Sequence, residues 1–366
     1  MPTSPVSIFR KFLRLIAFTI AWALTIPALL LSSLWMFSAH SFRVDLIANL
    51  GAQILILCIA VAIIDAILRR PRALVFALLA CAIQLTPLLE HRAAFLPRAP
   101  GPVSAPGAVR FLHYNDSCLS DKVDVYALME RSGADVLSIL CPPVQMQFDV
   151  IYGHGLEDKY PGKLLREWKP APDKVSTEIS AGFVVSRWPL TRVDCTFVGP
   201  MADRFIAGVV ERPGGRFAIV AVHPRSPRSE LRWLEGNNTV RALITLSRKL
   251  QNDGLPVVVL TDLNSSPTGW RSRAACDGGL LRRAKPLLYP DGTYPDVVPL
   301  NIRTGQTSSI GAIWPLSIAI DDALISPGIT VAAWTAQDRL RSEHRPVIID
   351  LTIPPTPASA PNPIDR

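Results

Sequence analysis

Charged side chains are scarce in this chain and absent from three long stretches near its N-terminus. Only 19% of the residues are charged, whereas 49% are hydrophobic and the mean hydropathy is +0.27. This balance is too apolar for an ordinary soluble protein, in which about 25% of residues carry a charge. The uncharged stretches are Leu15–Phe37, Leu46–Ile64 and Ala73–Leu89. Since about 20 apolar helical residues cross a bilayer, we predict three transmembrane helices within residues 1–89. A cleaved signal peptide is the alternative for the first stretch, but that stretch is too long and two more follow.

The chain also lacks a dense stripe of Lys and Arg, although its net charge is +8. Residues 1–89 contribute +5 of this charge and residues 90–366 only +3, so the excess is weak evidence for nucleic-acid binding. It does predict an orientation, because basic residues gather on the cytoplasmic side of membrane spans. The loop after the first stretch has only Arg43, whereas the cytoplasmic side would hold Arg10, Lys11, Arg14, Arg69, Arg70 and Arg72. In a bacterium the protein would lie in the inner membrane, with its N-terminus cytoplasmic and everything after Leu89 periplasmic.

Two segments have no apolar periodicity and are rich in Pro, and they bound the rest of the chain. Residues 90–107 are typical of an extended linker and residues 354–366 of a tail. Between them, residues 108–353 alternate short apolar strands with more polar segments, which predicts one α/β domain. We find no internal repeat of fixed period in the sequence.

Polar side chains stand at the ends of several predicted strands of this domain. The clearest case is the run Val257–Leu260, a buried strand followed at once by Thr261, Asp262 and Asn264. Polar residues at the carboxyl end of such a strand are positioned to meet a ligand, although Asp262 and Asn264 also suit a simple turn. Other strands are predicted at 109–114, 135–140, 182–186, 217–222, 318–325 and 346–351, with a helix at 228–250.

Seven polar residues at these strand ends supply the groups that phosphoester hydrolysis needs. They are two imidazoles, three carboxylates and two amides, which can activate water, hold a cation or bind phosphate oxygens. Each one also has an ordinary interpretation; His223, for example, suits a strand-end histidine bonded to backbone. The set is Asn115, His223, Asp262, Asn264, Asp321, Glu343 and His344.

The order of the motifs resembles the endonuclease/exonuclease/phosphatase (DNase I-like) superfamily. The similar segments are LHYND, ADVLSIL, AGFVVSRWP, VAVHPRSP, PVVVLTDLNSSP, IDDALIS and RSEHRPVIIDL. The resemblance covers nearly all of residues 108–353 and implies a four-layer sandwich of two β-sheets flanked by helices. Some bacterial members that look like this chain carry such a domain behind a few membrane spans.

The resemblance also implies a role for each matching residue. Asp262 would activate the attacking water, His344 would be the principal catalytic histidine, and Asp321 would hold its imidazole in the useful tautomer. His223 would donate to a phosphate oxygen. Asn264 would bind the scissile phosphate, and Asn115 would help to position phosphate or metal.

The chain departs from the family pattern at the metal site. The family places a metal-binding glutamate where this sequence has Cys141, and the aspartate of its Ser-Asp-His motif is Glu343 here. Mg²⁺ or Mn²⁺ would be the family's cofactor, and hard cations such as these take oxygen ligands rather than sulfur. Metal binding would then move to Glu343 and Asp262, with Asp321 or Asp322 as further oxygen ligands.

The four cysteines of the domain would lie in an oxidising compartment. In the family the strand ends that hold Cys118 and Cys141 lie side by side, so we hypothesise a disulfide between them where the metal would otherwise be held. Two buried thiols are the alternative. Cys195 and Cys276 complete the four, which allow three complete pairings.

Two functions of different classes follow. The first is a membrane-anchored phosphodiesterase, phosphatase or nuclease acting on a phosphoester, either nucleic acid or a phospholipid-type headgroup. The second is a catalytically lapsed domain of the same fold that binds phosphate ligands or serves as a scaffold. Cys141 favours the second, whereas the retained histidines and the Asp262/Asn264 pair favour the first. A purely structural membrane protein would leave the polar strand ends unexplained.

Overall fold

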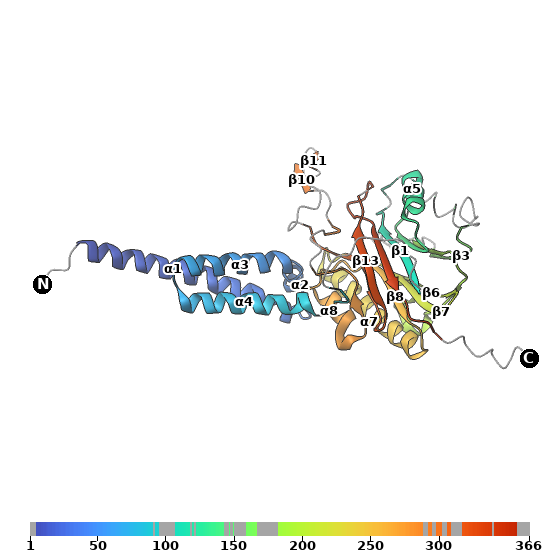
Figure 1. Ribbon diagram of the computed structural model, residues 1–366, viewed down its shortest axis with the longest axis horizontal. Helices are drawn as coiled ribbons and strands as arrows, with labels where there is room; N and C mark the ends of the chain where they lie inside the picture. Colours follow the sequence, from blue (N-terminus) through green and yellow to red (C-terminus); the bar gives the residue numbers. More distant parts are fainter. Residues whose placement is uncertain are drawn as a thin grey trace, which may run out of the picture. The chain divides into compact units, whose positions relative to one another are not determined.

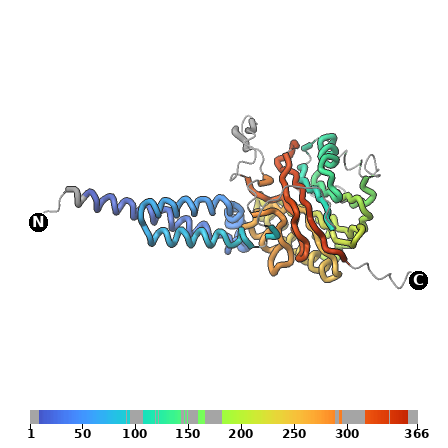
Figure 2. Tube along the Cα trace, viewed as in Figure 1, coloured from blue at the N-terminus to red at the C-terminus, as the bar shows by residue number. Residues whose placement is uncertain are grey.

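The structure is a computed structural model, and the chain forms two compact units (Figures 1 and 2). One unit comprises residues 1–90 with 266–270, and the other residues 91–265 with 271–366. The structure describes residues 5–90, 92–94, 107–117, 119–120, 122–142, 146, 149, 159–166, 182–287, 292–294, 298–301, 306–308, 317–338 and 340–356, with backbone only at 5–8, 298–301 and 306–308.

The first unit is helical, as its uncharged stretches predict. Its elements are α1 (Pro5–Ser33), the 3-10 turn η1 (Leu34–Phe37), α2 (Phe42–Ala48), α3 (Gly51–Ile67) and α4 (Pro71–Leu89). Ser41 caps α2 by accepting a hydrogen bond from the N–H of Val44, and Pro71 at the start of α4 has the backbone torsion that a first helical turn requires.

The number of membrane spans is settled only in part. Two helical stretches are long and apolar enough to cross a membrane, Phe9–Phe37 and Pro71–Leu89. The second predicted span falls on α2 and α3, which are bent by 64° at the short break between them and count as one span only if taken together. The described residues therefore hold two candidate spans, or three with this bent pair.

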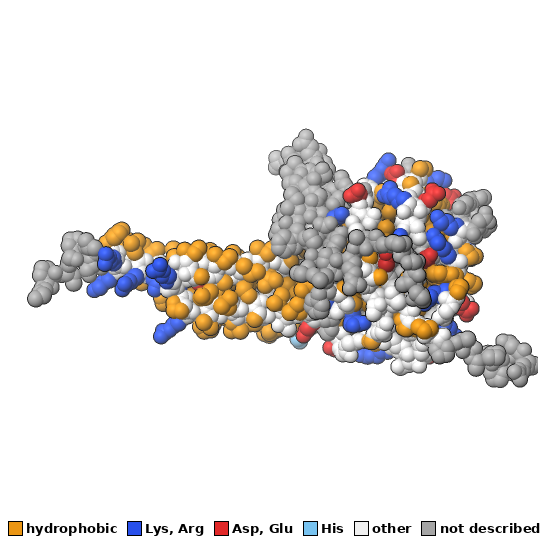
Figure 3. Space-filling model, in the orientation of Figure 1, with side chains coloured by type: hydrophobic (Ala, Val, Ile, Leu, Met, Phe, Trp, Pro, Cys, Tyr) orange, Lys and Arg blue, Asp and Glu red, His pale blue; other side chains and the backbone are white. Residues whose placement is uncertain are grey.

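Small side chains line the contacts among α1, α3 and α4. Ala28, Cys58, Ala77 and Ala80 are buried there, which lets the helix backbones approach closely. Large apolar side chains point outward instead, and Figure 3 shows them covering the surface of these helices. An apolar exterior of this extent is expected of a protein surface that faces lipid.

The second unit contains two six-stranded sheets. The strand order of the first sheet is β13-β14-β1-β2-β4-β3, and that of the second is β5-β6-β7-β8-β12-β9. The first sheet comprises β1 (Ala108–Asn115), β2 (Val136–Leu140), β3 (Gly162–Arg166), β4 (Gly182–Ser186), β13 (Thr330–Ala336) and β14 (Val347–Thr352). The second comprises β5 (Leu190–Arg192), β6 (Phe205–Arg212), β7 (Gly215–Val222), β8 (Val257–Asp262), β9 (Arg282–Arg283) and β12 (Asp321–Ile325).

Each sheet contains one parallel pair of strands joined by a helix. In the first sheet α5 (Lys122–Ser132) connects β1 to β2, and in the second α7 (Glu230–Asn252) connects β7 to β8. The shorter elements are η2 (Thr196–Arg204), α8 (Trp270–Cys276), η3 (Asp277–Gly279), and the two-stranded ribbon of β10 (Val298–Asn301) and β11 (Gln306–Ser308). All seven strands and the helix that we predicted from sequence are present, with ends displaced by at most three residues.

A hydrophobic core fills the space between the sheets. Phe111 from β1 and Phe217 from β7 meet there with their ring centroids 5.9 Å apart, and both are fully buried. On the outer face of the first sheet, α5 buries Leu128 and Met129 against β1 and β2. Helix α7 contacts β8 of the second sheet. The predicted α/β sandwich of two sheets with flanking helices is confirmed.

Candidate active site

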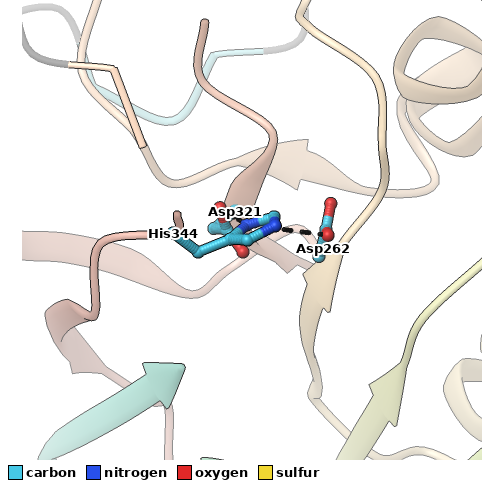
Figure 4. A group of neighbouring side chains, drawn as sticks. All are labelled: Asp262, Asp321 and His344. Atoms are coloured by element: carbon cyan, nitrogen blue, oxygen red, sulfur yellow. Dashed lines mark hydrogen bonds and ion pairs between the residues drawn. The ribbon is translucent and has the colours of Figure 1, made fainter. Parts of the chain in front are cut away.

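The two sheets bring polar strand ends together at one edge of the core. In the second sheet, Asp262 ends β8 and lies directly opposite Asp321, which begins the antiparallel neighbour β12. Asn115 ends β1 of the first sheet, and His344 precedes β14 beside it. Figure 4 shows the imidazole of His344 between the carboxylates of Asp262 and Asp321. Residues far apart in the sequence thus form one buried polar cluster.

Asp262 is the centre of this cluster. Its Oδ2 accepts a hydrogen bond from Asn115 Nδ2 at 2.9 Å and lies 3.3 Å from His223 Nε2, while its Oδ1 accepts from the backbone N–H of Asn264 at 2.7 Å. Burial alone would raise the pKa of Asp262, but the charge of His344 and the hydrogen bond of His223 outweigh burial and hold this pKa well below its usual range. The carboxylate is therefore ionised at neutral pH.

His344 and Asp321 form a buried pair. The His344 Nδ1 lies 2.9 Å from Asp321 Oδ2 and 3.8 Å from Asp262 Oδ2. Burial alone would lower the pKa of His344, but the carboxylates of Asp321 and Asp262 raise it to about 9. Burial raises the pKa of Asp321 against the effect of the imidazolium. A histidine in this setting carries a proton at neutral pH.

The backbone around His344 is held by local hydrogen bonds. Ser342 Oγ donates to the carbonyl of Asn115 at 2.8 Å and accepts from the N–H of His344 at 3.1 Å. The ring of Tyr294 packs against the imidazole with centroids 4.8 Å apart. Tyr294 could not be predicted from the sequence, because an aromatic residue in a polar loop has no periodicity that would place it on His344.

His223 and Asn264 also lie in the cluster. The imidazole of His223 is half-buried, with Nε2 facing Asp262 and Nδ1 lying 3.9 Å from the Sγ of Cys141. Asn264 has a φ of +51°, and its Nδ2 donates to the carbonyl of Pro224 at 3.2 Å. These bonds shape the loop after β8. The phosphate contacts that the resemblance implies for His223, Asn264 and Asn115 stay predictions.

Two predicted metal ligands, Glu343 and Asp322, are not among the described residues whose ligand atoms gather around His344. Glu343 is exposed to solvent. Asp322 is buried in another network, where it accepts from Arg283 Nε at 2.8 Å and from Trp334 Nε1 at 2.9 Å. Because neighbouring residues of a strand point to opposite faces, Asp321 and Asp322 cannot both reach the site.

A different set of three residues could hold a metal ion. Among the described residues, Asp262, Asp321 and His344 each offer one ligand atom, and these atoms lie within 4.8 Å of one another. Asp321 Oδ1 is buried and has no hydrogen-bond partner there, so it is an acceptor available to a cation. Two carboxylates and one imidazole fit a divalent ion, although His344 would have to lose its proton first.

The cysteine predictions are resolved only for two thiols. Cys195 and Cys276 are free and buried, so the four cysteines do not pair completely. Cys141 directly follows β2 and has a φ of +48°. Its hypothesised partner Cys118 lies outside the described residues, and the disulfide stays a prediction.

One buried histidine lies near the site without an evident role in it. His113 of β1 is completely buried, its Nδ1 lies 3.4 Å from Ser138 Oγ, and burial lowers its pKa to about 3. It is therefore neutral, and we assign it to packing. Nothing in the sequence distinguishes His113, because it stands within an apolar strand.

One family model and several solved structures are similar to this chain. The model of the Endonuclease/Exonuclease/phosphatase family matches residues 111–344. No curated protein matches the chain. Similar solved structures include an endonuclease/exonuclease/phosphatase from Beutenbergia cavernae DSM 12333, with 16% identity, a TM-score of 0.45 and coverage of 68% of this chain and 72% of that chain.

Two further structures are similar to the same degree. The human Nocturnin catalytic domain with bound sulfate has 15% identity and a TM-score of 0.47, and the match covers 67% of this chain and 94% of that one. Sphingomyelinase C from Streptomyces griseocarneus has 17% identity and a TM-score of 0.43, and the match covers 66% of this chain and 99% of that one.

Proposed function

Because this chain belongs to the Endonuclease/Exonuclease/phosphatase family, we propose that it hydrolyses a phosphoester at the cluster of Asp262, His344 and Asp321. The observation that carries this proposal is the buried contact of an ionised carboxylate, Asp262, with a protonated imidazole, His344. Hydrolysis of a phosphoester needs one group that orients water and another that stabilises negative charge on phosphate oxygens. The cluster offers both.

Asp262 would orient the attacking water. Its Oδ2 is engaged by Asn115 and His223, and its Oδ1 accepts a hydrogen bond from Asn264 N–H, so Oδ1 keeps a second acceptor position. A carboxylate whose orientation is held by three neighbours can align a water molecule without reorganising.

His344 would supply positive charge and a proton. Because Asp321 accepts the Nδ1 proton at 2.9 Å, the other nitrogen of the imidazolium, Nε2, carries the proton that can be donated to a phosphate oxygen. Asn115 Nδ2 lies 3.5 Å from this Nε2, which places an amide donor next to the same position.

A divalent ion, Mg²⁺ or Mn²⁺, would be held by the carboxylates of Asp262 and Asp321, while His344 keeps its proton. When bound it would act as a Lewis acid on a phosphoryl oxygen. Glu343, which the sequence predicts as a metal ligand, would join these residues if its exposed side chain turned toward the cluster.

One observation favours the second function, a lapsed domain that binds phosphate ligands. Cys141, where the family has its metal-binding glutamate, stands beside His223 and offers sulfur in place of oxygen. The alternative predicts binding of inorganic phosphate without turnover.

We also propose where the protein lies and which classes of substrate it acts on. The N-terminal helices would anchor the protein in a bacterial inner membrane with the second unit in the periplasm. A phospholipid-type headgroup and nucleic acid are both candidate substrates.

The test is hydrolysis of bis-p-nitrophenyl phosphate and p-nitrophenyl phosphate by the full-length protein in detergent, with Mg²⁺, Mn²⁺ or chelator. We expect Asp262→Ala and His344→Ala each to lower the rate by about a hundredfold or more. Asp203→Ala and His40→Ala remove the same side chains from exposed positions and serve as controls. Activity that ignores the first two substitutions would refute the site, and no turnover with any metal, together with phosphate binding, would support the lapsed domain.

A further inference from the structure

The helical unit contains a cavity far in sequence from the proposed active site. Its volume is about 530 Å³. Phe18 and Trp22 of α1 form one side, and residues 69–73, where α3 is joined to α4, form the other. The inference drawn from it does not depend on the phosphoesterase activity.

Three guanidinium groups line this cavity and no carboxylate does. Arg69, Arg70 and Arg72 are the charged lining residues. Within the described part of the chain, none of the three forms an ion pair. The nearby acid on α3, Asp65, is buried and accepts a hydrogen bond from Thr25 Oγ1 at 2.8 Å. The charged side chains that line the cavity are therefore all positive.

Arg70 has a donor that the protein leaves unused. Its Nη2 donates to the carbonyl of Arg14, but its Nε is buried and has no partner among the described residues. A buried N–H without an acceptor is unfavourable, and an anionic ligand oxygen would satisfy it. Arg69 next to it has a φ of +55°, a conformation that glycine adopts more readily, so the loop presents an arginine where sterics alone would not favour one.

The opposite wall of the cavity is aromatic. The ring of Trp22 lies 6.4 Å from that of Phe18 and 5.6 Å from that of Phe76 on α4. Phe18 and Phe76 are 50% and 41% exposed on the outer surface of the helices. This aromatic row leads from the arginines along the apolar exterior, and it would contact a hydrocarbon chain rather than water.

The cavity lies where headgroups would be. Pro71 is the first residue of one candidate span, so the arginines stand at the end of that span. Helix α1 carries three further basic residues before Phe18, namely Arg10, Lys11 and Arg14. By the distribution of basic residues, this end faces the cytoplasm.

We propose that this cavity binds an anionic phospholipid of the cytoplasmic leaflet. Its phosphate would contact Arg69, Arg70 and Arg72, and its acyl chain would lie along Trp22 and Phe76. A basic pocket between helices at this side of a membrane has the chemistry that anionic headgroups require. The aromatic wall distinguishes a lipid from soluble phosphate, which has no apolar part to bury.

Native mass spectrometry of the full-length protein tests the proposal. The protein is released from detergent with phosphatidylglycerol or phosphatidylcholine of identical acyl chains, and the retained lipid is counted. We expect the double variant Arg69→Gln/Arg72→Gln to bind phosphatidylglycerol about thirtyfold more weakly, since each basic residue near the surface contributes about fivefold. The matched control Arg10→Gln/Lys11→Gln removes the same charge outside the cavity and should retain most of the binding.

A second measurement locates the lipid. Phosphatidylglycerol with brominated acyl chains should quench part of the tryptophan fluorescence, and Trp22→Phe should remove that part. Equal losses in both double variants, or equal retention of phosphatidylcholine, would overturn the proposal in favour of general surface attraction. Displacement of phosphatidylglycerol by glycerol phosphate at equal concentration would overturn it in favour of a soluble phosphate ligand. Matching melting temperatures of the variants show that the helices remain folded.

Discussion

Replacing Asp321 with Asn removes the carboxylate that contributes most to keeping His344 protonated. The substitution preserves the size of the side chain, and the amide oxygen can still accept from Nδ1 at the 2.9 Å separation of the wild-type pair. The negative charge is lost while Asp262 stays 3.8 Å from Nδ1. The substitution therefore tests charge more than geometry.

The expected change follows from the contact distance and the burial of both groups. An opposite charge in direct contact raises a histidine pKa by about 1–3 units. In the wild type the pKa of His344 is raised to about 9, and in Asp321→Asn it should fall by about 1–3 units, because only Asp262 and Glu343 remain to oppose burial. At pH 8 most wild-type molecules would carry the His344 proton, whereas about half of the variant molecules or fewer would carry it.

The assay is kcat as a function of pH with the full-length protein and a phosphodiester. The wild-type rate should decline as the pH rises through about 9, where His344 loses its proton. In Asp321→Asn this alkaline limb should move down by about 1–3 pH units, whereas the rate at pH 6 should be reduced by about a hundredfold at most. Asp277→Asn, which changes an exposed aspartate, is the control.

Stability provides an independent measure of the same linkage. The folded protein binds the His344 proton more tightly than the unfolded chain, because the pKa rises from 6.5 to about 9 on folding. This contribution to stability is fully present below pH 6.5 and is lost as the pH rises through about 9. The melting temperature of Asp321→Asn should therefore depend less on pH in that window. If Asp321→Asn loses rate equally at all pH values and keeps its alkaline limb at the wild-type position, then the charge of Asp321 does not keep His344 protonated and the reasoning is refuted.

Three further predictions concern other parts of the second unit. Cys141→Glu restores an oxygen ligand beside His223 and should lower the Mg²⁺ concentration for half-maximal activity by about tenfold, whereas Cys141→Ser should not; equal behaviour in a Mg²⁺ titration would count against a metal at this edge. Burial raises the pKa of Asp116 to about 6, so its ionised form destabilises the fold above that pH. Asp116→Asn should then melt higher than wild type at pH 8 and show little difference at pH 4, and a constant difference would contradict the linkage. Asp322→Ala leaves the buried Arg283 without its partner and should reduce the free energy of unfolding by about 3–5 kcal/mol in chemical denaturation, while an unchanged value would show that this ion pair is unimportant.

Local patterns in the sequence predicted the elements and most residues of the polar cluster around Asp262. The run Val257–Leu260 is apolar on both faces, and the structure buries every residue of β8. Asp262, His223 and Asn115 each follow an apolar run, and this position predicted that they would lie at the site. A strand that ends at a sheet edge leaves its last side chains open to a ligand. The uncharged stretches likewise predicted helices for the first unit, since length and apolarity are local properties.

Pairing through space was decided only by the tertiary structure. The sequence left open whether Asp321 or Asp322 would be the further oxygen ligand for a metal, because which face of β12 meets Asp262 depends on its register with β8. Nor could it place Tyr294 on His344 or leave Glu343 exposed. The 64° bend between α2 and α3 likewise interrupts a stretch that hydropathy treats as continuous. Hydrophobic periodicity records how much of each residue is buried, whereas sheet order and register determine which buried polar groups meet.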